Sequence, residues 1–232
     1  VVAPLFPDAP TPGMRVLTQK LFEAFAYNIN VRIADEARSD VTANIFVHEI
    51  GVAHDDYRPD IDLGVEASGA SMLMAAPAME PVEIYPLDDN GVRVSAILVQ
   101  HAPVFPAFAY RFDTPSGSAV FSGDTGPCDN VVRLAQGADY LVHEVIDLGF
   151  VADRVANFPN RDSLINHLTE SHTSAEDAGR IAARAGVKTL VLSHQVPGDS
   201  EVSEDVWESR ARSEFDGNVV CGVDLAQFAL SQ

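Results

Sequence analysis

Three side chains of the kinds that bind metal ions each follow a short apolar run in this sequence. They are His101, Asp124 and His194, and the runs before them are residues 92–100, 118–121 and 189–193. Apolar, β-branched runs bounded by glycine indicate buried strands, and a side chain at a strand end can be held rigidly and still reach a ligand. Imidazole and carboxylate are ligands that zinc prefers. We therefore expect these three residues to belong to one metal site.

Strand ends are often polar, so any one of the three would be weak evidence. The coincidence of three carries more weight. It is accompanied by further short motifs in a fixed order along the chain. The motifs are Val99-Gln-His101, Phe121-Ser-Gly-Asp-Thr125, Leu141-Val-His-Glu144, Ser171-His-Thr173 and Leu192-Ser-His194.

In this order the motifs resemble the metallo-β-lactamase-fold hydrolases, and most of all the branch with ribonuclease Z and phosphodiesterase-like and arylsulfatase-like enzymes. Ser-Gly-Asp-Thr alone is short enough to occur by chance, so the order carries the resemblance. It covers residues 85–200. It implies an α/β fold, the metallo-β-lactamase αββα sandwich, of which this chain would supply mainly the C-terminal part.

The family's strongest signature, H-x-H-x-D-H, does not occur in this chain. None of its seven histidines forms an H-x-H pair, and His54-Asp-Asp56 lacks the second histidine. The sequence opens on Val1, without a Met and as if within a domain. We therefore expect residues 1–232 to be a single metallo-β-lactamase-like domain that is incomplete at its N-terminus. The alternative is a degenerate, non-catalytic relative that has lost half of its site.

The resemblance implies a role for each candidate residue. His101 would bind a first metal ion, Asp124 would bridge two ions, and His194 would bind the second. His172 would be catalytic, stabilising an oxyanion or protonating a leaving group, and Glu144 would orient it as a hydrogen-bond acceptor. The expected cofactor is zinc, as two ions when the site is complete, and iron or manganese would suit the same ligands.

The charge balance bears on the substrate. The net charge is −19, with 34 Asp and Glu against 15 Lys and Arg. Such a surface repels a polyphosphate unless a local basic patch overrides it. We therefore expect a zinc-dependent hydrolase whose metal-bound hydroxide cleaves a small molecule, such as a phosphodiester, sulfate ester or lactone, and regard nucleic acid as disfavoured. The alternative is a ribonuclease Z-type endonuclease that processes tRNA 3′ ends.

Other partners are constrained less. No apolar run approaches the roughly 18 residues of a membrane span, so we expect no membrane contact. The sequence leaves the cellular compartment open. It also leaves the oligomeric state open, and a homodimer is one of the possible states. The run Met72–Ala76 could line a substrate pocket, although local core packing is the favoured explanation.

The elements that position the candidate residues can be outlined from periodicity. We expect a helix from Gly13 to about Tyr27, then a strand at 41–50. Strands at 81–88 and 91–101 would form a hairpin around Asn90-Gly91. Further strands are expected at 107–112, 118–122 and 139–145, and tight turns between successive strands would make the sheet largely antiparallel.

The second half should alternate helices and strands. Residues 148–168 carry few regular signals and are expected to form an active-site loop, with Phe150 and Phe158 available to a substrate. A capping box at Thr173–Glu176 predicts a helix that ends at Gly186. A helix at 201–214 and closing strands at 218–221 and 225–230 complete the expected fold.

Overall fold

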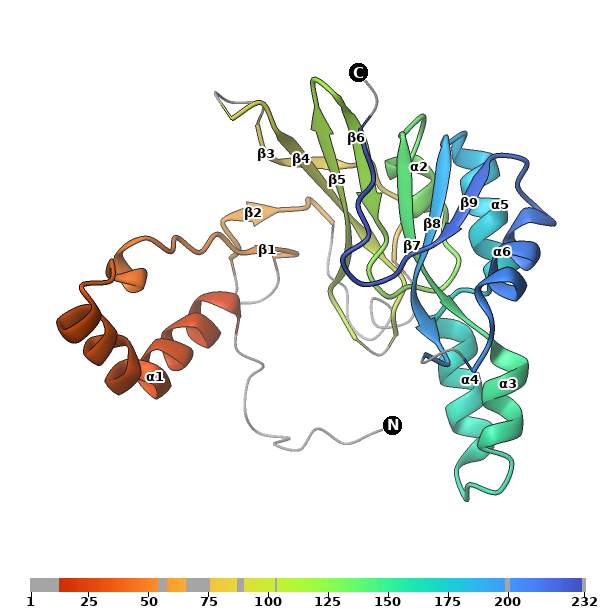
Figure 1. Ribbon diagram of the computed structural model, residues 1–232, viewed down its shortest axis with the longest axis horizontal. Helices are drawn as coiled ribbons and strands as arrows, with labels where there is room; N and C mark the ends of the chain where they lie inside the picture. The colour runs from red at the N-terminus through yellow and green to blue at the C-terminus, as the bar shows by residue number, and fades with distance from the viewer. Residues whose placement is uncertain are drawn as a thin grey trace. The chain divides into compact units, whose positions relative to one another are not determined.

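The structure is a computed structural model, and it describes residues 13–53, 58–65, 76–86, 90–102, 104–198 and 201–230. Two compact units make up the chain, Val1–Gly64 and Val65–Gln232, and their elements are labelled in Figure 1. The residues His54–Asp56 and most of the run Met72–Ala76 lie outside the described residues.

The first unit contains one long helix and little sheet. The helix α1 (Met14–Glu36) continues nine residues past the predicted Tyr27 and buries none of its side chains. The predicted strand at 41–50 is wrong. A 3₁₀ turn, η1 (Val41–Ala43), occupies its start because the Asp40 side chain accepts from the Thr42 N–H, a local bond that competes with strand pairing. Short parallel strands β1 (Ile50–Gly51) and β2 (Ile61–Asp62) complete the unit.

The second unit is built on one seven-stranded sheet whose strands follow sequence order. Those strands are β3 (Val82–Tyr85), β4 (Arg93–Val99), β5 (Ala107–Thr114), β6 (Gly117–Phe121), β7 (Tyr140–Ile146), β8 (Thr189–Val196) and β9 (Asn218–Cys221). From β3 to β6 the pairs are antiparallel, as predicted, and from β6 to β9 they are parallel. The second half departs from the prediction because its connections contain helices, which parallel pairs require.

Helices cover one face of this sheet (Figure 1). The helices α2 (Asp129–Leu134), α5 (Ala175–Ala185) and α6 (Glu204–Arg212) pack there against β4, β5, β7, β8 and β9. Their apolar side chains and those of the strands form the core, which includes Ile97, Val120, Leu141, Ile181, Leu190, Leu192 and Trp207. None of the described helices is both long and apolar enough to cross a membrane.

The segment predicted as an active-site loop is instead a pair of helices, α3 (Leu148–Arg154) and α4 (Arg161–Ser171). The Asp147 side chain caps α3 by accepting from the Phe150 N–H at 3.0 Å. In α4 the apolar positions are few, which is why periodicity did not reveal it. Figure 1 shows the pair projecting beyond one end of the sheet.

The start of α5 lies one residue later than the predicted capping box. Ser174 is its N-cap and accepts from the Asp177 N–H at 3.1 Å. The Thr173 hydroxyl is used elsewhere. The predicted end is confirmed, because Gly186 adopts the left-handed conformation with φ 64°. The predicted closing strand at 225–230 is wrong, since these residues form no strand.

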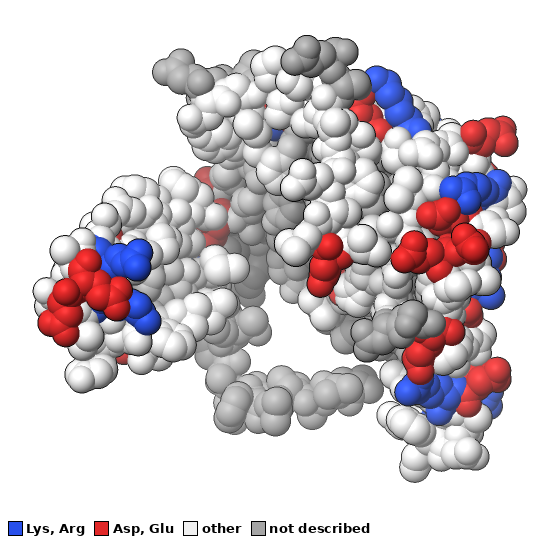
Figure 2. All heavy atoms as spheres, in the orientation of Figure 1, with Lys and Arg blue, Asp and Glu red and all other residues white. Residues whose placement is uncertain are grey.

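On the face of the second unit shown in Figure 2, charged side chains lie mostly over the helices at the right of the view, whereas the surface over β4 to β6 is mostly uncharged. In the second unit, arginine and carboxylate side chains form ion pairs, such as that of Arg210 with Asp147, whose N and O atoms are 2.7 Å apart.

Strand direction decides where the candidate residues meet. Since β4 and β6 are both antiparallel to β5, they run the same way, and β7 and β8 are parallel to β6. The carboxyl ends of all four strands therefore share one edge of the sheet. His101, Asp124 and the end of β8 lie at that edge, as the strand-end pattern predicted.

Candidate active site

The loop that carries Asp124 is held close to its neighbours by two glycines. Gly123 has φ +60°, and a Cβ there would lie 2.7 Å from the Phe108 carbonyl oxygen. A Cβ on Gly126 would collide with the carbonyl oxygen of Glu170. Only glycine fits such close approaches of backbone to backbone. The short glycine-flanked turn after β6 therefore has a steric reason.

Thr125 fixes this loop from inside the protein. Thr125 is fully buried. Its N–H donates to Glu144 Oε1 at 3.0 Å, its hydroxyl accepts from the Gln100 N–H at 3.2 Å, and its carbonyl accepts from the Thr173 hydroxyl at 2.6 Å. The Asp124 loop is thus tied to the ends of β4 and β7 and to the start of α5.

Glu144 joins the same network to the candidate catalytic histidine. Its Oε1 accepts a second hydrogen bond from His172 Nδ1 at 3.0 Å, and its Oε2 has no hydrogen-bond partner among the described residues. With a carboxylate as the acceptor, the proton of His172 is assigned to Nδ1. This hydrogen bond to Glu144 raises the pKa of His172 against the opposing effect of burial, and the charges of Glu144 and Asp124 add to the rise.

The predicted residues form one continuous cluster around His172. The ring of His101 lies edge-on to the ring of His172, with centroids 5.2 Å apart. The ring of His194 is 6.3 Å away on the same measure. His194 Nε2 is in turn 3.5 Å from Asp124 Oδ2. The structure therefore brings together all five residues that the sequence singled out.

His194 reaches the cluster through a β-bulge in β8. In the pairing with β7, Glu144 lies opposite Ser193 and Val145 lies opposite Gln195, so His194 is the extra residue. Its φ is +44°, a conformation that costs a residue with a Cβ about 1 kcal/mol or more. Bulges often re-aim a side chain beside an active site. The strand continues to Val196 rather than ending before His194 as predicted.

The three proposed metal ligands suit a metal by their chemistry. The Nδ1 of His101 lies 3.0 Å from the Ser171 carbonyl oxygen, so it donates there and leaves Nε2 free as a ligand, an arrangement common in metal-binding histidines. Asp124 and His194 converge as a pair. Within the part of the chain that the structure describes, no group of three His, Cys, Asp or Glu side chains converges on a single point that could hold an ion.

The buried polar residues that support the cluster were not predicted from the sequence. They are Ser122, Thr125, Ser171 and Thr173, which are all almost fully buried. Ser122 accepts from the Glu144 N–H at 3.1 Å, and the Ser171 hydroxyl donates to the Ala102 carbonyl. All four lie within the motifs Ser-Gly-Asp-Thr and Ser-His-Thr. Hydroxyl residues beside proposed ligands are the signal that could have revealed them.

His143 behaves differently from the other motif histidines. It is fully buried, and its Nδ1 lies 2.8 Å from the Glu144 carbonyl oxygen. Burial lowers the pKa of His143, which favours the neutral ring. The side chain belongs to the interior, where its contact with the cluster is this one to the backbone of Glu144.

Comparison with known proteins agrees with the motif order. The sequence-family model described as the beta-lactamase superfamily domain matches residues 38–195. A ribonuclease Z of Mycobacterium tuberculosis strain H37Rv is 32% identical over 223 residues, which are 96% of this chain and 68% of that protein. The ribonuclease Z of Mycobacterium marinum is 36% identical over 170 residues, or 71% of this chain and 58% of that protein.

A solved structure of human tRNase Z, short form, aligns with 66% of this chain and 47% of its own, at a TM-score of 0.43 and 19% identity.

The names of the sequence relatives correct one expectation. Ribonucleases act on RNA, so the preference for a small-molecule substrate over nucleic acid was wrong. The net charge led to the wrong substrate prediction because it sums charge over the whole surface, whereas binding depends on local groups. The chain belongs to the metallo-β-lactamase superfamily of hydrolases, in its ribonuclease Z branch.

Proposed function

We propose that this protein is a metal-dependent ribonuclease of the ribonuclease Z type, which hydrolyses a phosphodiester bond at the 3′ end of tRNA precursors. The observation that carries the proposal is the continuous contact from Asp124 through His194 and His172 to the buried Glu144. Relatives that are named ribonuclease Z and align over most of the chain support RNA as the substrate.

In this proposal His101, Asp124 and His194 hold zinc, as a pair of ions. Iron or manganese would fit the same nitrogen and oxygen ligands. When bound, the metal supplies an activated water and neutralises charge on the phosphate. Three side chains are too few for two ions, so water or other protein groups are needed to complete the coordination.

His172 is the proposed proton donor to the oxygen that leaves phosphorus. As water adds to phosphorus, the P–O bond to the leaving strand breaks and its oxygen takes up a proton. The hydrogen bond from Nδ1 to Glu144 fixes the ring and favours its protonated form. General acid catalysis of this kind contributes about 10²- to 10⁴-fold to a rate. Glu144 acts through His172, which makes it a positioning residue.

The test is cleavage of a tRNA transcript with a 3′ extension, beside hydrolysis of bis-p-nitrophenyl phosphate as the small-molecule comparison. We expect EDTA to abolish cleavage of the transcript and zinc to restore it. Asp124→Asn should lose the bound metal, measured by plasma mass spectrometry, together with the activity. His172→Asn should keep the metal and lose about 10²-fold or more in rate.

A matched control is His48→Asn, because His48 is exposed and lies in the first unit, outside the cluster. Its metal content and rate should equal those of the unmodified protein. Cleavage that survives EDTA, or metal content that is unchanged in Asp124→Asn, would contradict the proposal. Protein that binds no metal and cleaves neither substrate would favour the non-catalytic alternative.

A further inference from the structure

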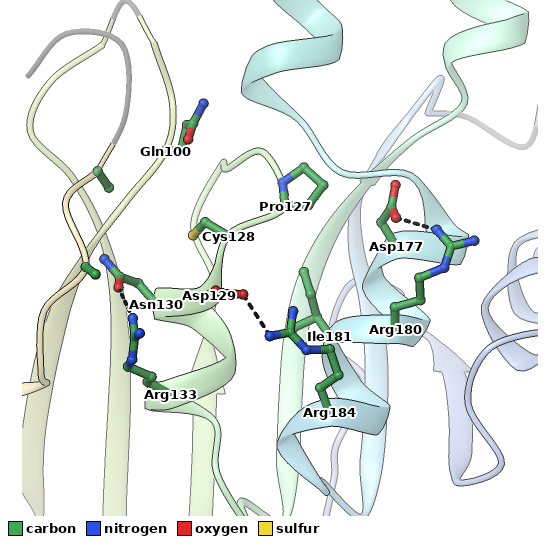
Figure 3. A pocket seen from close by; sticks show the side chains of 12 residues that line it. Gln100, Pro127, Cys128, Asp129, Asn130, Arg133, Asp177, Arg180, Ile181 and Arg184 are labelled. Carbon is green, nitrogen blue, oxygen red and sulfur yellow. Dashed lines mark hydrogen bonds and ion pairs between the residues drawn. The ribbon is translucent and has the colours of Figure 1, made fainter. Parts of the chain in front are cut away.

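A second polar site adjoins the candidate active site. It is a pocket of about 470 Å³ between α2 and α5, a size typical of sites that bind small ligands or groups. Figure 3 shows it lined by side chains of both helices and by Gln100 and Pro127 above them. Nothing in the sequence motifs indicated it.

The lining is basic in a protein that is otherwise acidic. Three of the chain's 13 arginines, Arg133, Arg180 and Arg184, line the pocket with two aspartates, Asp129 and Asp177. Glu214, outside the lining, also pairs with Arg180, so among the described residues Arg133 is the arginine of this pocket without a paired carboxylate, in a chain that carries a net charge of −19. An arginine without a paired carboxylate attracts anions locally, whatever the sign of the whole molecule.

The three arginines differ in how far they are already neutralised. Arg180 binds Asp177 and also Glu214, at 2.5 and 2.9 Å. Arg184 reaches across from α5 to a single carboxylate, that of Asp129 on α2, at 2.8 Å (Figure 3).

Arg133 has the least charge compensation. Its hydrogen bond goes to the neutral amide oxygen of Asn130 at 2.9 Å, and it forms no ion pair with a described residue. The guanidinium forks of Arg133 and Arg184 are the groups most available to a new anion, and their geometry suits the bidentate binding of phosphate.

The pocket includes residues that adjoin His101 and the Asp124 loop in the sequence. Gln100, in its lining, directly precedes His101, and Pro127 and Cys128 follow the Asp124 loop. Cys128 Sγ is 3.8 Å from the hydroxyl of Thr125, the residue that anchors that loop. The pocket and the proposed cleavage site therefore share one loop and one edge of the sheet.

We propose that this pocket binds a backbone phosphate of the RNA substrate, with Arg133 and Arg184 as its ligands, next to the phosphate that is cleaved. The inference rests on the proposed ribonuclease function and adds a substrate-binding subsite to it. Asp129 competes with the phosphate for Arg184. Its removal should therefore strengthen binding, an effect that a purely structural role for these residues would not produce.

The experiment measures the affinity of a fluorescein-labelled RNA hairpin with a single-stranded 3′ extension, in EDTA so that the RNA is not cleaved. Affinity is measured between 50 and 300 mM KCl. For single strands the slope of log affinity against log salt is about −0.7 per phosphate contact. We expect Arg133→Gln to reduce that slope by about one such contact and affinity about 5-fold.

Three further variants sharpen the result. Arg133→Lys keeps the charge and should keep the slope. Asp129→Asn should raise affinity a few-fold. Arg93→Gln is the control for the loss of one arginine charge, because Arg93 begins β4, at the strand end opposite the pocket. It should bind RNA as the unmodified protein does. Thermal melting of each variant checks that it is folded.

The two proposals fail in different ways. If the unmodified protein neither binds the hairpin nor cleaves the transcript, both the ribonuclease function and the phosphate subsite are overturned. If it binds and cleaves RNA while Arg133→Gln and Asp129→Asn match Arg93→Gln in slope and affinity, the ribonuclease function stands and the subsite alone is overturned. A lower slope for Arg133→Gln together with tighter binding by Asp129→Asn supports the subsite.

Discussion

Glu144 and Asp124 are two carboxylates at the same edge of the sheet, and each contacts a histidine of the candidate active site. They differ in burial, since 2% of the Glu144 side chain and 38% of the Asp124 side chain is exposed. Glu144 accepts two hydrogen bonds from inside the protein, whereas Asp124 Oδ2 has His194 at 3.5 Å. The buried carboxylate is placed to hold the site together, and the exposed one is free to bind.

Burial makes Glu144 a costly choice of residue. A carboxylate loses much hydration in the interior, and one of its oxygens has no hydrogen-bond partner among the described residues. Among the described residues, its hydrogen bonds from Thr125 and His172 are what offsets that cost. An apolar side chain would fill the space at a lower cost, so we infer that Glu144 is present for the position it gives to the Asp124 loop and to His172.

The largest expected effect follows from removing Glu144. In Glu144→Ala the buried N–H of Thr125 and the Nδ1–H of His172 both lose their acceptor. Each unpaired buried donor costs about 1–3 kcal/mol, partly offset because a buried charge is also removed. We expect a loss of about 3 kcal/mol in the free energy of unfolding, measured by urea denaturation in EDTA.

Asp124→Ala is the matched change at the exposed carboxylate. We expect it to alter the free energy of unfolding by less than about 0.5 kcal/mol, because the Asp124 side chain is partly exposed and makes, among the described residues, one long contact, to His194 at 3.5 Å. Both variants should lose cleavage activity, the first through position and the second through loss of the proposed ligand. Equal effects on stability would show that the contrast between the two carboxylates has no energetic basis.

A smaller effect is expected from crowding the Asp124 loop without touching a polar group. In Gly126→Ala the new methyl would collide with the Glu170 carbonyl at the end of α4, and overpacking of this kind costs about 1–3 kcal/mol. Gly137→Ala is the control, because Gly137 has φ +62° and, apart from its chain neighbours, no atom of the described residues would lie within 4 Å of a Cβ there.

The two alanine variants separate steric crowding from backbone strain. The control should cost about 1 kcal/mol through its left-handed conformation and leave the cleavage rate unchanged. Gly126→Ala should also reduce the rate, because the loop that it displaces carries Asp124. A rate equal to that of the control would mean that the position of the loop does not matter for the reaction.

The strands next to the site could be predicted because their signals are local. The boundaries of β4, β6 and β7 were close to those expected from apolar runs and glycines. The helix pair α3 and α4 could not, since few apolar residues recur at helical spacing and tertiary contacts decide the outcome. The parallel pairing of β7 with β8 likewise depends on the helices α3, α4 and α5 that connect them. A prediction made one strand at a time does not take such connections into account.

The candidate site divides in the same way. The five residues with chemistry of their own were identified from motifs, and the structure brings them together. The bulge that aims His194 and the network through Thr125 depend on pairing between segments far apart in sequence. The pocket arginines lie on two helices and become neighbours only through packing, so neither the motifs nor the net charge could indicate the pocket.

The smallest expected effect concerns protons on the two histidines next to Glu144. The hydrogen bond to Glu144 raises the pKa of His172, and burial lowers the pKa of His143. His172 therefore contributes stability that is complete below its ordinary pKa of about 6.5 and is lost as the pH rises through its raised value. His143 acts in the opposite direction, because its contribution is lost as the pH falls below about 6.5.

Ring nitrogen resonances, followed by NMR against pH in EDTA, report the two histidines separately. We expect His172 to keep its second proton to a higher pH than His143. In Glu144→Gln the neutral amide no longer attracts that proton, so the pKa of His172 should fall while the ring of His143 stays neutral. If the pKa of His172 is unchanged by this substitution, Glu144 does not set its protonation. The buried carboxylate would then act on the Asp124 loop alone, through its hydrogen bond from Thr125.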